Sequence, residues 1–307
     1  MTIYQAATAY LLYFISYARI DLTSGLSAAP PSNTPDVLRS YVFGETDARC
    51  WEVLSSEIAT SEEEDEVEYW CPTRKRHFEF SIPSSSVSSE SATTIRQTSF
   101  GCGKLGAEIW DSSVALCLYL GQQALTEGKK ILELGAGCGL PSVVCRDELR
   151  ASSVLATDFW EQDDNFDQDR LVPTKYHGLN LEHNVAATSS SVQCLDWHDR
   201  DSAISARESF RPDLIIGSDL VYYPMDVEPL LNVLEILLKS NDQESQTRAV
   251  LALPLAPANR EALPEFREKV QVRFSETHSV TLQELDLVRE DTEGEDSIHL
   301  FIDIVPK

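Results

Sequence analysis

Three glycines stand at alternate positions of one stretch, at Gly135, Gly137 and Gly139. They follow the mainly apolar run 131–134 and precede Pro141 and a further apolar segment. Such a run is typical of a buried strand, and closely spaced glycines let the backbone approach a ligand. A helix can begin near Pro141, because the first helical position does not need its N–H. The stretch therefore predicts a nucleotide-binding strand–turn–helix unit with the ligand at the helix N-terminus.

The spacing of the glycines and the acid before them distinguish between nucleotides. The dinucleotide fingerprint is G-x-G-x-x-G, whereas this chain reads G-x-G-x-G with Glu133 two residues ahead, which disfavours a dehydrogenase. A carboxylate at that place repels a pyrophosphate and attracts the cationic amino-acid end of S-adenosyl-L-methionine. E-x-G-x-G-x-G is the pattern of motif I in class I methyltransferases, so we expect a methyl-donor site. Another nucleotide fold and a plain glycine-rich turn remain alternatives.

Polar residues follow the next two strands that the pattern predicts. In open α/β sheets the ligand lies beyond the carboxyl ends of the strands. The second strand ends at Asp158, whose carboxylate suits a pair of ribose hydroxyls, with a helix N-cap as the alternative. The third ends in Asp196 and Trp197, which suit the adenine amino group and a stacked purine. A tryptophan of the core is the alternative for Trp197.

The fourth strand ends in the run from Ser218 to Tyr222, where the transferable methyl group should point. Amino-adenine methyltransferases carry an Asn/Asp-Pro-Pro-aromatic tetrad here, and its absence disfavours adenine methylation. Asp219, three residues before Tyr222, supplies an anion beside an aromatic face. That pair suits an ammonium side chain that must lose its proton.

Together these residues resemble the methyltransferase-like family of seven-β-strand protein-lysine N-methyltransferases, marked by a D-x-x-Y motif. The resemblance covers about residues 75–305 and rests on an ordered set of positions: Trp110–Ser113, Glu133–Gly139, Thr157 with Asp158, Asn180 with Asn184, Asp196 with Trp197, and Asp219 with Tyr222. It implies a protein substrate with a lysine acceptor. The family includes modifiers of translation elongation factors and of molecular chaperones.

The resemblance also implies roles for single positions. Asp219 and Tyr222 would line the lysine channel as the catalytic pair, with Arg260 near the acceptor cleft. No metal is expected. The cofactor is S-adenosyl-L-methionine, and the positions that would bind it are Trp110, Glu133, Gly135, Ala136, Gly137, Gly139, Asp158, Asp196, Trp197 and Ser218.

Alternation of apolar and helix-like segments after residue 110 predicts a parallel, doubly wound sheet. The expected strands are Lys130–Gly135, Ser153–Asp158, Val192–Trp197, Asp213–Asp219 and Arg248–Leu255. The expected helices cover about 141–150, 171–185, 226–239 and 259–269, besides one after Trp110 that Asp111 or Ser112 caps. Val270–Val280 and Ile298–Val305 should form an antiparallel edge hairpin. This is the α/β, Rossmann-like, seven-stranded sheet of a class I S-adenosylmethionine-dependent methyltransferase.

The first part of the chain predicts an extension, residues 1–74, before a methyltransferase domain at 75–307. Tyr4–Ile20 is too short and mixed to span a membrane, so we expect an amphipathic helix, with a weak membrane or targeting role as the alternative. Residues 21–40 are typical of a linker. The acidic segment from Glu45 to Glu68 is typical of a solvated loop. Arg76–Ile82 and Thr93–Phe100 predict a hairpin.

Composition limits the partners. With a net charge of −25 and a pI near 4.5, the chain repels phosphate backbones, so we expect no nucleic acid. A basic protein would be attracted, especially by the acidic insertion 161–169; high solubility and a plain insertion are the simpler readings. Seven cysteines without a C-x-x-C pair favour a reducing compartment, the cytoplasm and also the nucleus. We expect a monomer.

Two other functions remain open on the sequence alone. The same fold can methylate a histidine, a protein N-terminus or a small molecule. It can also act as a non-catalytic adaptor that only binds the methyl donor.

Overall fold

The computed structural model describes residues 37–38, 41–54, 69–80, 93–98, 104–160, 181–186, 189–239, 246–255, 261–287 and 297–307. Several predicted features lie outside these residues. They are the amphipathic helix at Tyr4–Ile20, most of the linker, the acids around Glu62, the insertion 161–169, Asn180 and Arg260.

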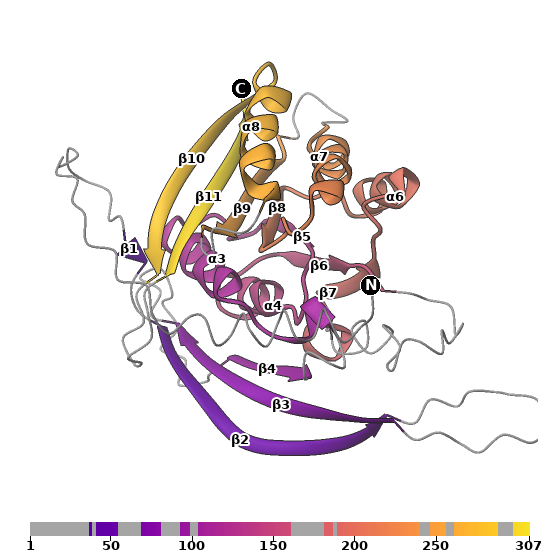
Figure 1. Ribbon diagram of the computed structural model, residues 1–307, viewed down its shortest axis with the longest axis vertical. Coiled ribbons are helices and arrows are strands. Elements are labelled where there is room, and N and C mark those ends of the chain that lie inside the picture. The colour runs from indigo at the N-terminus through magenta and orange to yellow at the C-terminus, as the bar shows by residue number, and fades with distance from the viewer. Residues whose placement is uncertain are drawn as a thin grey trace, which may run out of the picture. The chain divides into compact units, whose positions relative to one another are not determined.

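The described residues form a large sheet with the strand order β1-β10-β11-β9-β8-β5-β6-β7 (Figure 1). Strands β9, β8, β5, β6 and β7 pair in parallel, β1 pairs in parallel with β10, and β11 runs antiparallel to both β9 and β10. The strand order reverses at β5. This topology confirms the predicted class I fold, to which a two-residue edge strand is added. The strands are β1 (Val37–Leu38), β5 (Lys130–Leu134), β6 (Ser153–Asp158), β7 (Ser190–Cys194), β8 (Leu214–Ser218), β9 (Arg248–Pro254), β10 (His278–Leu287) and β11 (Ser297–Pro306).

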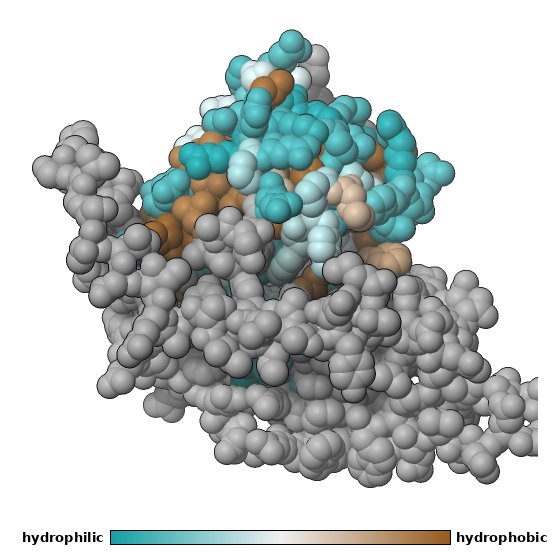
Figure 2. Space-filling view, in the orientation of Figure 1, coloured by the Kyte–Doolittle hydropathy of each residue, from teal (hydrophilic) through white to brown (hydrophobic). Residues whose placement is uncertain are grey.

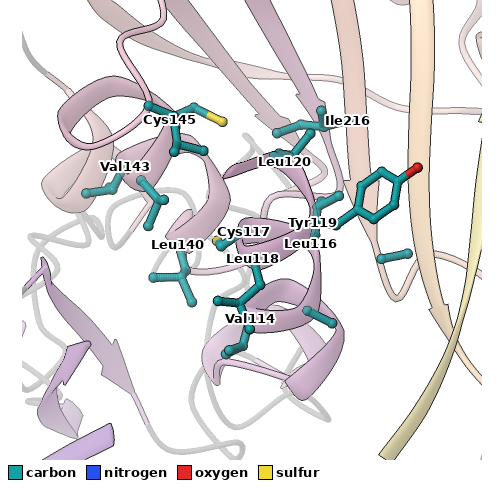
Figure 3. Packing of buried hydrophobic residues seen from close by; sticks show 14 of the residues in the cluster. Val114, Leu116, Cys117, Leu118, Tyr119, Leu120, Leu140, Val143, Cys145 and Ile216 are labelled. Carbon is teal, nitrogen blue, oxygen red and sulfur yellow. The ribbon is translucent and has the colours of Figure 1, made fainter. Parts of the chain in front are cut away.

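Helices cover both faces of this sheet because successive strand residues point to opposite sides. Ile131 and Ile216 belong to the core formed with α3 and α4, whereas Leu132 and Ile215 belong to the core formed with α6, α7 and α8. Figure 3 shows the first core, where side chains of α3 and α4 meet Ile216. The helices are η1 (Lys104–Ala107), α3 (Asp111–Gln122), α4 (Leu140–Asp147), α6 (Arg200–Phe210), α7 (Pro224–Leu238) and α8 (Ala262–Phe274).

A second, antiparallel sheet has the order β2-β3-β4 and consists of β2 (Tyr41–Leu54), β3 (Tyr69–Phe80) and β4 (Thr93–Thr98). The predicted hairpin is confirmed, since Phe78 pairs with Thr93. The predicted acidic loop is wrong as far as Leu54, because Glu45 lies opposite Arg76 in β2–β3 pairing. Strand-forming aromatic and β-branched residues of this segment outweigh its acids. The proposed boundary at residues 74/75 falls inside β3.

Three local predictions are also wrong. The predicted cap of α3, Asp111 or Ser112, is wrong. The N-cap residue is Trp110, and no side chain makes a capping hydrogen bond there. Helix α6 is unpredicted because only Ala203 and Ala206 are buried on it, which leaves no hydrophobic stripe to detect. Val270–Phe274 is helical rather than extended, since Phe266, Val270 and Phe274 recur four residues apart on the buried side of α8.

The outer surface over α7 and α8 is mainly hydrophilic (Figure 2). Glu228 of α7 lies 2.8 Å from Lys269 Nζ and 2.6 Å from Arg273 Nη2 of α8. These ion pairs join the two helices on the side away from the sheet. Across the described ranges, no helix has the length and apolar character that crossing a membrane requires.

Arg248 of β9 and Asp303 of β11 form a partly buried two-pronged ion pair, with Nε 2.7 Å from Oδ1 and a second contact between Nη2 and Oδ2. Asp303→Ala leaves the guanidinium without this partner and should lower the free energy of unfolding by about 2 kcal/mol. Urea denaturation measures it. Glu127→Ala, which removes an exposed pair with Arg150, should cost less than about 0.5 kcal/mol. Equal losses of unfolding free energy in the two variants would mean that the Arg248–Asp303 pair contributes no more to stability than an exposed ion pair.

Candidate functional site

The glycine turn, residues 135–139, connects β5 to α4. Its three glycines have φ of +59°, +57° and +81°, where L side chains are disfavoured. A Cβ at Gly135 would lie 2.6 Å from Leu220, and one at Gly139 would lie 2.5 Å from Val185. At Gly137 a Cβ would meet nothing closer than 3.7 Å. Two glycines are therefore needed for packing, whereas at Gly137 there is room for a methyl group against the Gly106 backbone. We term this space beside the bare Gly137 backbone the cradle.

Asp158, the last residue of β6, is fixed beside that cradle. Its Oδ2 accepts a hydrogen bond from the Gly137 N–H at 2.7 Å, and its Oδ1 accepts one from the Phe159 N–H at 2.7 Å. The structure therefore joins two of the predicted binding residues, Gly137 and Asp158, at the end of β6.

Glu133 is fully buried and acts on the helix that follows the turn. Its Oε2 accepts from the Ser142 N–H at 2.9 Å and from the Ser142 hydroxyl, while Oε1 has no hydrogen-bond partner. The N-cap residue of α4 is Gly139, which has no side chain, so the carboxyl group of Glu133 supplies the cap. Burial raises the pKa of Glu133 to about 8. Its predicted contact with the methyl donor stays a prediction.

The D-x-x-Y loop starts beside the glycine turn. Leu134 pairs with Gly217, so Gly135 and Ser218 follow at the same level of neighbouring parallel strands. Asp219 is buried, has φ of +56°, and donates its N–H to the Ala252 carbonyl at 2.9 Å. A left-handed conformation is uncommon outside glycine and is enriched at functional sites.

Leu220 is a site residue that sequence reasoning missed. One of its methyl carbons lies 2.6 Å from where a Cβ of Gly135 would stand, and the other lies 2.6 Å from the same point at Gly217. Its side chain therefore fills the space between the ends of β5 and β8. The signal was its place inside the D-x-x-Y motif, next to Asp219. Tyr222 lies half-buried farther along the loop, its ring 6.4 Å from the exposed Tyr223 ring.

Trp197 also lies beside the first glycine of the turn. Its indole Cζ2 would be 3.6 Å from a Cβ at Gly135, and the ring is half-buried. Asp196 Oδ1 accepts from the His198 N–H at 2.8 Å, and the imidazole Nδ1 lies 3.3 Å from the same oxygen. The second carboxylate oxygen of Asp196 is not used in these contacts. The arrangement suits the predicted adenine site, which stays a prediction.

Trp110 reaches the site through the segment before it. Its indole Nε1 donates to the Leu105 carbonyl at 2.9 Å, so the ring is tied to η1. The Cys138 thiol in turn donates to the Ala107 carbonyl at 3.1 Å and to the Gly106 carbonyl at 3.4 Å, so η1 contacts the glycine turn. Burial raises the pKa of Cys138 well above its usual range, and its thiol is therefore no nucleophile at neutral pH.

Within the part of the chain that the structure describes, no group of three His, Cys, Asp or Glu side chains is placed to hold a metal ion.

A sequence profile of the family described as "Lysine methyltransferase" matches residues 89–252, which is more than half of the 307. The match includes the glycine turn, Asp158, Trp197 and the D-x-x-Y loop. The chain belongs to this family. Its members take the methyl group from S-adenosyl-L-methionine.

Individual relatives match over the same central part. The chain is 29% identical over 157 residues to "Protein N-terminal and lysine N-methyltransferase EFM7" of Cryptococcus neoformans, which covers 49% of each chain. It is 29% identical over 137 residues to "Protein N-lysine methyltransferase METTL21A" of Danio rerio, over 43% of this chain and 51% of the relative. The chain thus spans about half the length of the curated relatives it matches.

Among solved structures, a SAM-dependent methyltransferase from Anabaena variabilis covers 64% of this chain and 87% of its own, at 14% identity and a TM-score of 0.44.

The residues present fit the family's methyl donor. The cradle at Gly137 offers bare backbone, and next to it stands the carboxylate of Asp158, a group that accepts hydrogen bonds from hydroxyls. The half-buried Trp197 places an aromatic ring beside Gly135, where it also packs against the core under α7. Backbone, carboxylate and ring are the groups that an amino acid, a ribose and an adenine require.

Two glycine variants distinguish a loss of stability caused by overpacking from a loss of ligand affinity caused by filling the cradle. Gly137→Ala has room for its methyl group, so it should cost only about 1 kcal/mol of stability for the left-handed backbone. Because the methyl group fills the cradle, S-adenosylhomocysteine should bind at least about tenfold more weakly by calorimetry. Gly139→Ala should instead cost about 3 kcal/mol, since it meets Val185 and Leu181. Unchanged ligand binding by Gly137→Ala would contradict the assignment of the space beside Gly137 to the ligand.

Glu133 should make stability depend on pH. Between its ordinary pKa of 4.5 and about 8, the folded protein binds one more proton than the unfolded chain, so stability falls as pH rises. Compared with Glu133→Gln, the wild type should lose roughly 1.4 kcal/mol per pH unit from about pH 5 to 7.5. Urea denaturation across this range measures the difference. Parallel pH profiles would mean that Glu133 stays ionised in the folded protein.

Proposed function

We propose that this chain is a protein N-methyltransferase that transfers methyl groups from S-adenosyl-L-methionine to a lysine side chain of a protein. One observation carries the proposal: the glycine turn after β5 and the D-x-x-Y loop after β8 leave the sheet at the same level of two paired strands. The donor cradle and the acid of the acceptor motif are therefore neighbours. Membership of the lysine methyltransferase family and the names of the relatives support lysine as the acceptor.

The reaction needs a neutral amine beside the donor. When bound, S-adenosyl-L-methionine supplies a methyl group activated by its sulfonium. A free lysine with a pKa of about 10.4 is neutral at pH 7 in only about one molecule in 2,500, which corresponds to roughly 4.6 kcal/mol. The lysine ammonium loses one proton before attack; the neutral nitrogen then bonds to the methyl carbon as the sulfur–carbon bond breaks, which leaves a methylated ammonium and S-adenosylhomocysteine. The protein must lower this cost and hold the amine in line.

Asp219 and Tyr222 divide these tasks in the proposed site. The Asp219 carboxylate attracts the ammonium and orients it, but it also stabilises the charged form and is therefore a poor route to deprotonation. The Tyr222 ring removes water from the amine, which favours the neutral form. The proton then leaves through water. Most of the rate acceleration comes from positioning.

The substrate that fits best is a basic protein segment. The chain has a net charge of −25, and Asp158, Asp196 and Asp219 all stand at the carboxyl ends of the strands. These charges attract cationic partners and slow the approach of anionic ones. A translation factor or a chaperone with an exposed lysine would satisfy the requirement, and the protein would act on it as a monomer.

A protein N-terminal amine is the second candidate acceptor. The EFM7 relative carries both activities in its name, "N-terminal and lysine N-methyltransferase". Both acceptors are primary amines, and an α-amine with a pKa near 8 is easier to deprotonate than a lysine. Mass spectrometry of labelled products distinguishes them, because the methyl group lies either on the first residue or on an internal lysine.

Asp219→Asn tests the acceptor role and keeps a residue that tolerates the left-handed backbone. It should lower methylation of cell lysate about 100-fold, while S-adenosylhomocysteine affinity stays within about threefold. The measurements are transfer of radiolabel and calorimetry. Asp201→Asn, the same change at an exposed position of α6, should leave both unchanged.

Loss of S-adenosylhomocysteine binding with retained transfer would overturn the role of Asp219. A wild-type protein that binds S-adenosylhomocysteine and labels no protein would favour the adaptor function instead. A methylated histidine as the product would overturn the lysine acceptor.

A further inference from the structure

One side chain outside the predicted site connects the glycine turn to the second sheet. Asn184, in the helical segment 181–185, accepts from the Arg96 N–H through Oδ1 at 3.0 Å. Its Nδ2 donates to the Arg96 carbonyl at 2.7 Å and to the Cys138 carbonyl at 2.8 Å. The amide thus pairs with β4 as a neighbouring peptide group would, and with its other N–H it holds the middle of the glycine turn.

A second arm runs from β4 back to the turn. Gln97 Oε1 accepts from the Ile109 N–H at 3.3 Å, and Arg76 Nη1 of β3 donates to the Ile109 carbonyl at 3.2 Å. Ile109 follows η1, whose Ala107 carbonyl accepts from the Cys138 thiol. The contacts therefore close a ring through β4, Asn184, Cys138 and η1, which we term the turn clamp.

We propose that Asn184 is a positioning residue for methyl-donor binding, and that through the turn clamp the β2–β4 sheet belongs to the donor site. Only an amide can fill this place, because it must accept from one N–H and donate to two carbonyls. An aspartate keeps the first contact and turns the other two into repulsions. The inference rests on the proposed function only in taking S-adenosyl-L-methionine as the ligand.

The clamp acts on the part of the turn that the ligand needs in one conformation. Gly137 is held from one side by Asp158, and Gly139 is packed against Val185 and Leu181. Cys138 lies between these two and has its carbonyl fixed by Asn184. A turn ordered before binding loses less conformational entropy when the ligand arrives. The D-x-x-Y loop is held by other contacts on β8 and β9, so acceptor chemistry should not depend on Asn184.

The test uses the full chain with Asn184→Asp and with Asn184→Ala. S-adenosylhomocysteine should bind about tenfold more weakly to both variants by calorimetry. The KM for the donor should rise in proportion, while kcat at saturating donor stays within about threefold. His183→Asp is the matched control, since it adds the same charge at an exposed neighbouring position and should bind like the wild type.

Hydrogen exchange supplies a second readout without ligand or turnover. In Asn184→Asp, amides of the glycine turn and of β4 should exchange faster, while amides of β9 and β11 should stay as protected as in the wild type. Wild-type donor affinity in both Asn184 variants, or faster exchange spread evenly over the whole domain, would overturn the inference. If the wild type binds no S-adenosylhomocysteine, the proposed function fails, and the local exchange result still decides whether the clamp exists.

Discussion

The parallel pairing of β5 with β8 is the contact on which the rest of the site depends. It sets Leu134 opposite Gly217, so the two chains leave the sheet at one level and turn over the same edge. The side chain of Leu220 can then pack over both Gly135 and Gly217. A slip of one residue in this register would turn every side chain of a strand to the opposite face and separate these groups. The strand order reverses here, where α/β proteins bind their ligands.

The glycine turn has to meet two demands that oppose each other. It must be bare at Gly137 for a ligand to approach, and glycines raise the entropy that ordering removes. Polar groups from elsewhere supply the order that side chains of the turn cannot. Asp158 holds the Gly137 N–H, Glu133 caps the helix that follows, and Asn184 holds the Cys138 carbonyl. The buried carboxyl group of Glu133 is the costly member of this set, because desolvation favours its neutral form.

The sequence predicts the features that depend on residues close together in the chain, and it does not predict contacts between residues far apart in the chain. β6 was predicted with its observed bounds, Ser153–Asp158, since an apolar run that ends in an acid is a local pattern. The class I sheet and the location of Gly137 and Asp158 at one edge of it follow from the order of strands and helices along the chain, whereas their hydrogen bond was not predicted. Asn184 belonged to the recognised pattern, but its partner Arg96 lies 88 residues away, and no periodicity reports such a contact. Ser142 and Leu220 were missed for the same reason, because their roles exist only after the chain has folded.

Charge at the acceptor end creates a conflict that the D-x-x-Y loop must resolve. In the proposed site, a field from 50 acids and 25 bases would draw a lysine toward the motif, and the same field would keep the lysine protonated. Adding further carboxylates would improve capture and impair transfer. A single buried acid in a fixed, left-handed conformation limits this effect, because Asp219 can hold the amine in one direction. On the proposed mechanism the aromatic ring of Tyr222 then has to supply the desolvation that favours the neutral amine, and this requirement would couple an acid to an aromatic residue in one motif.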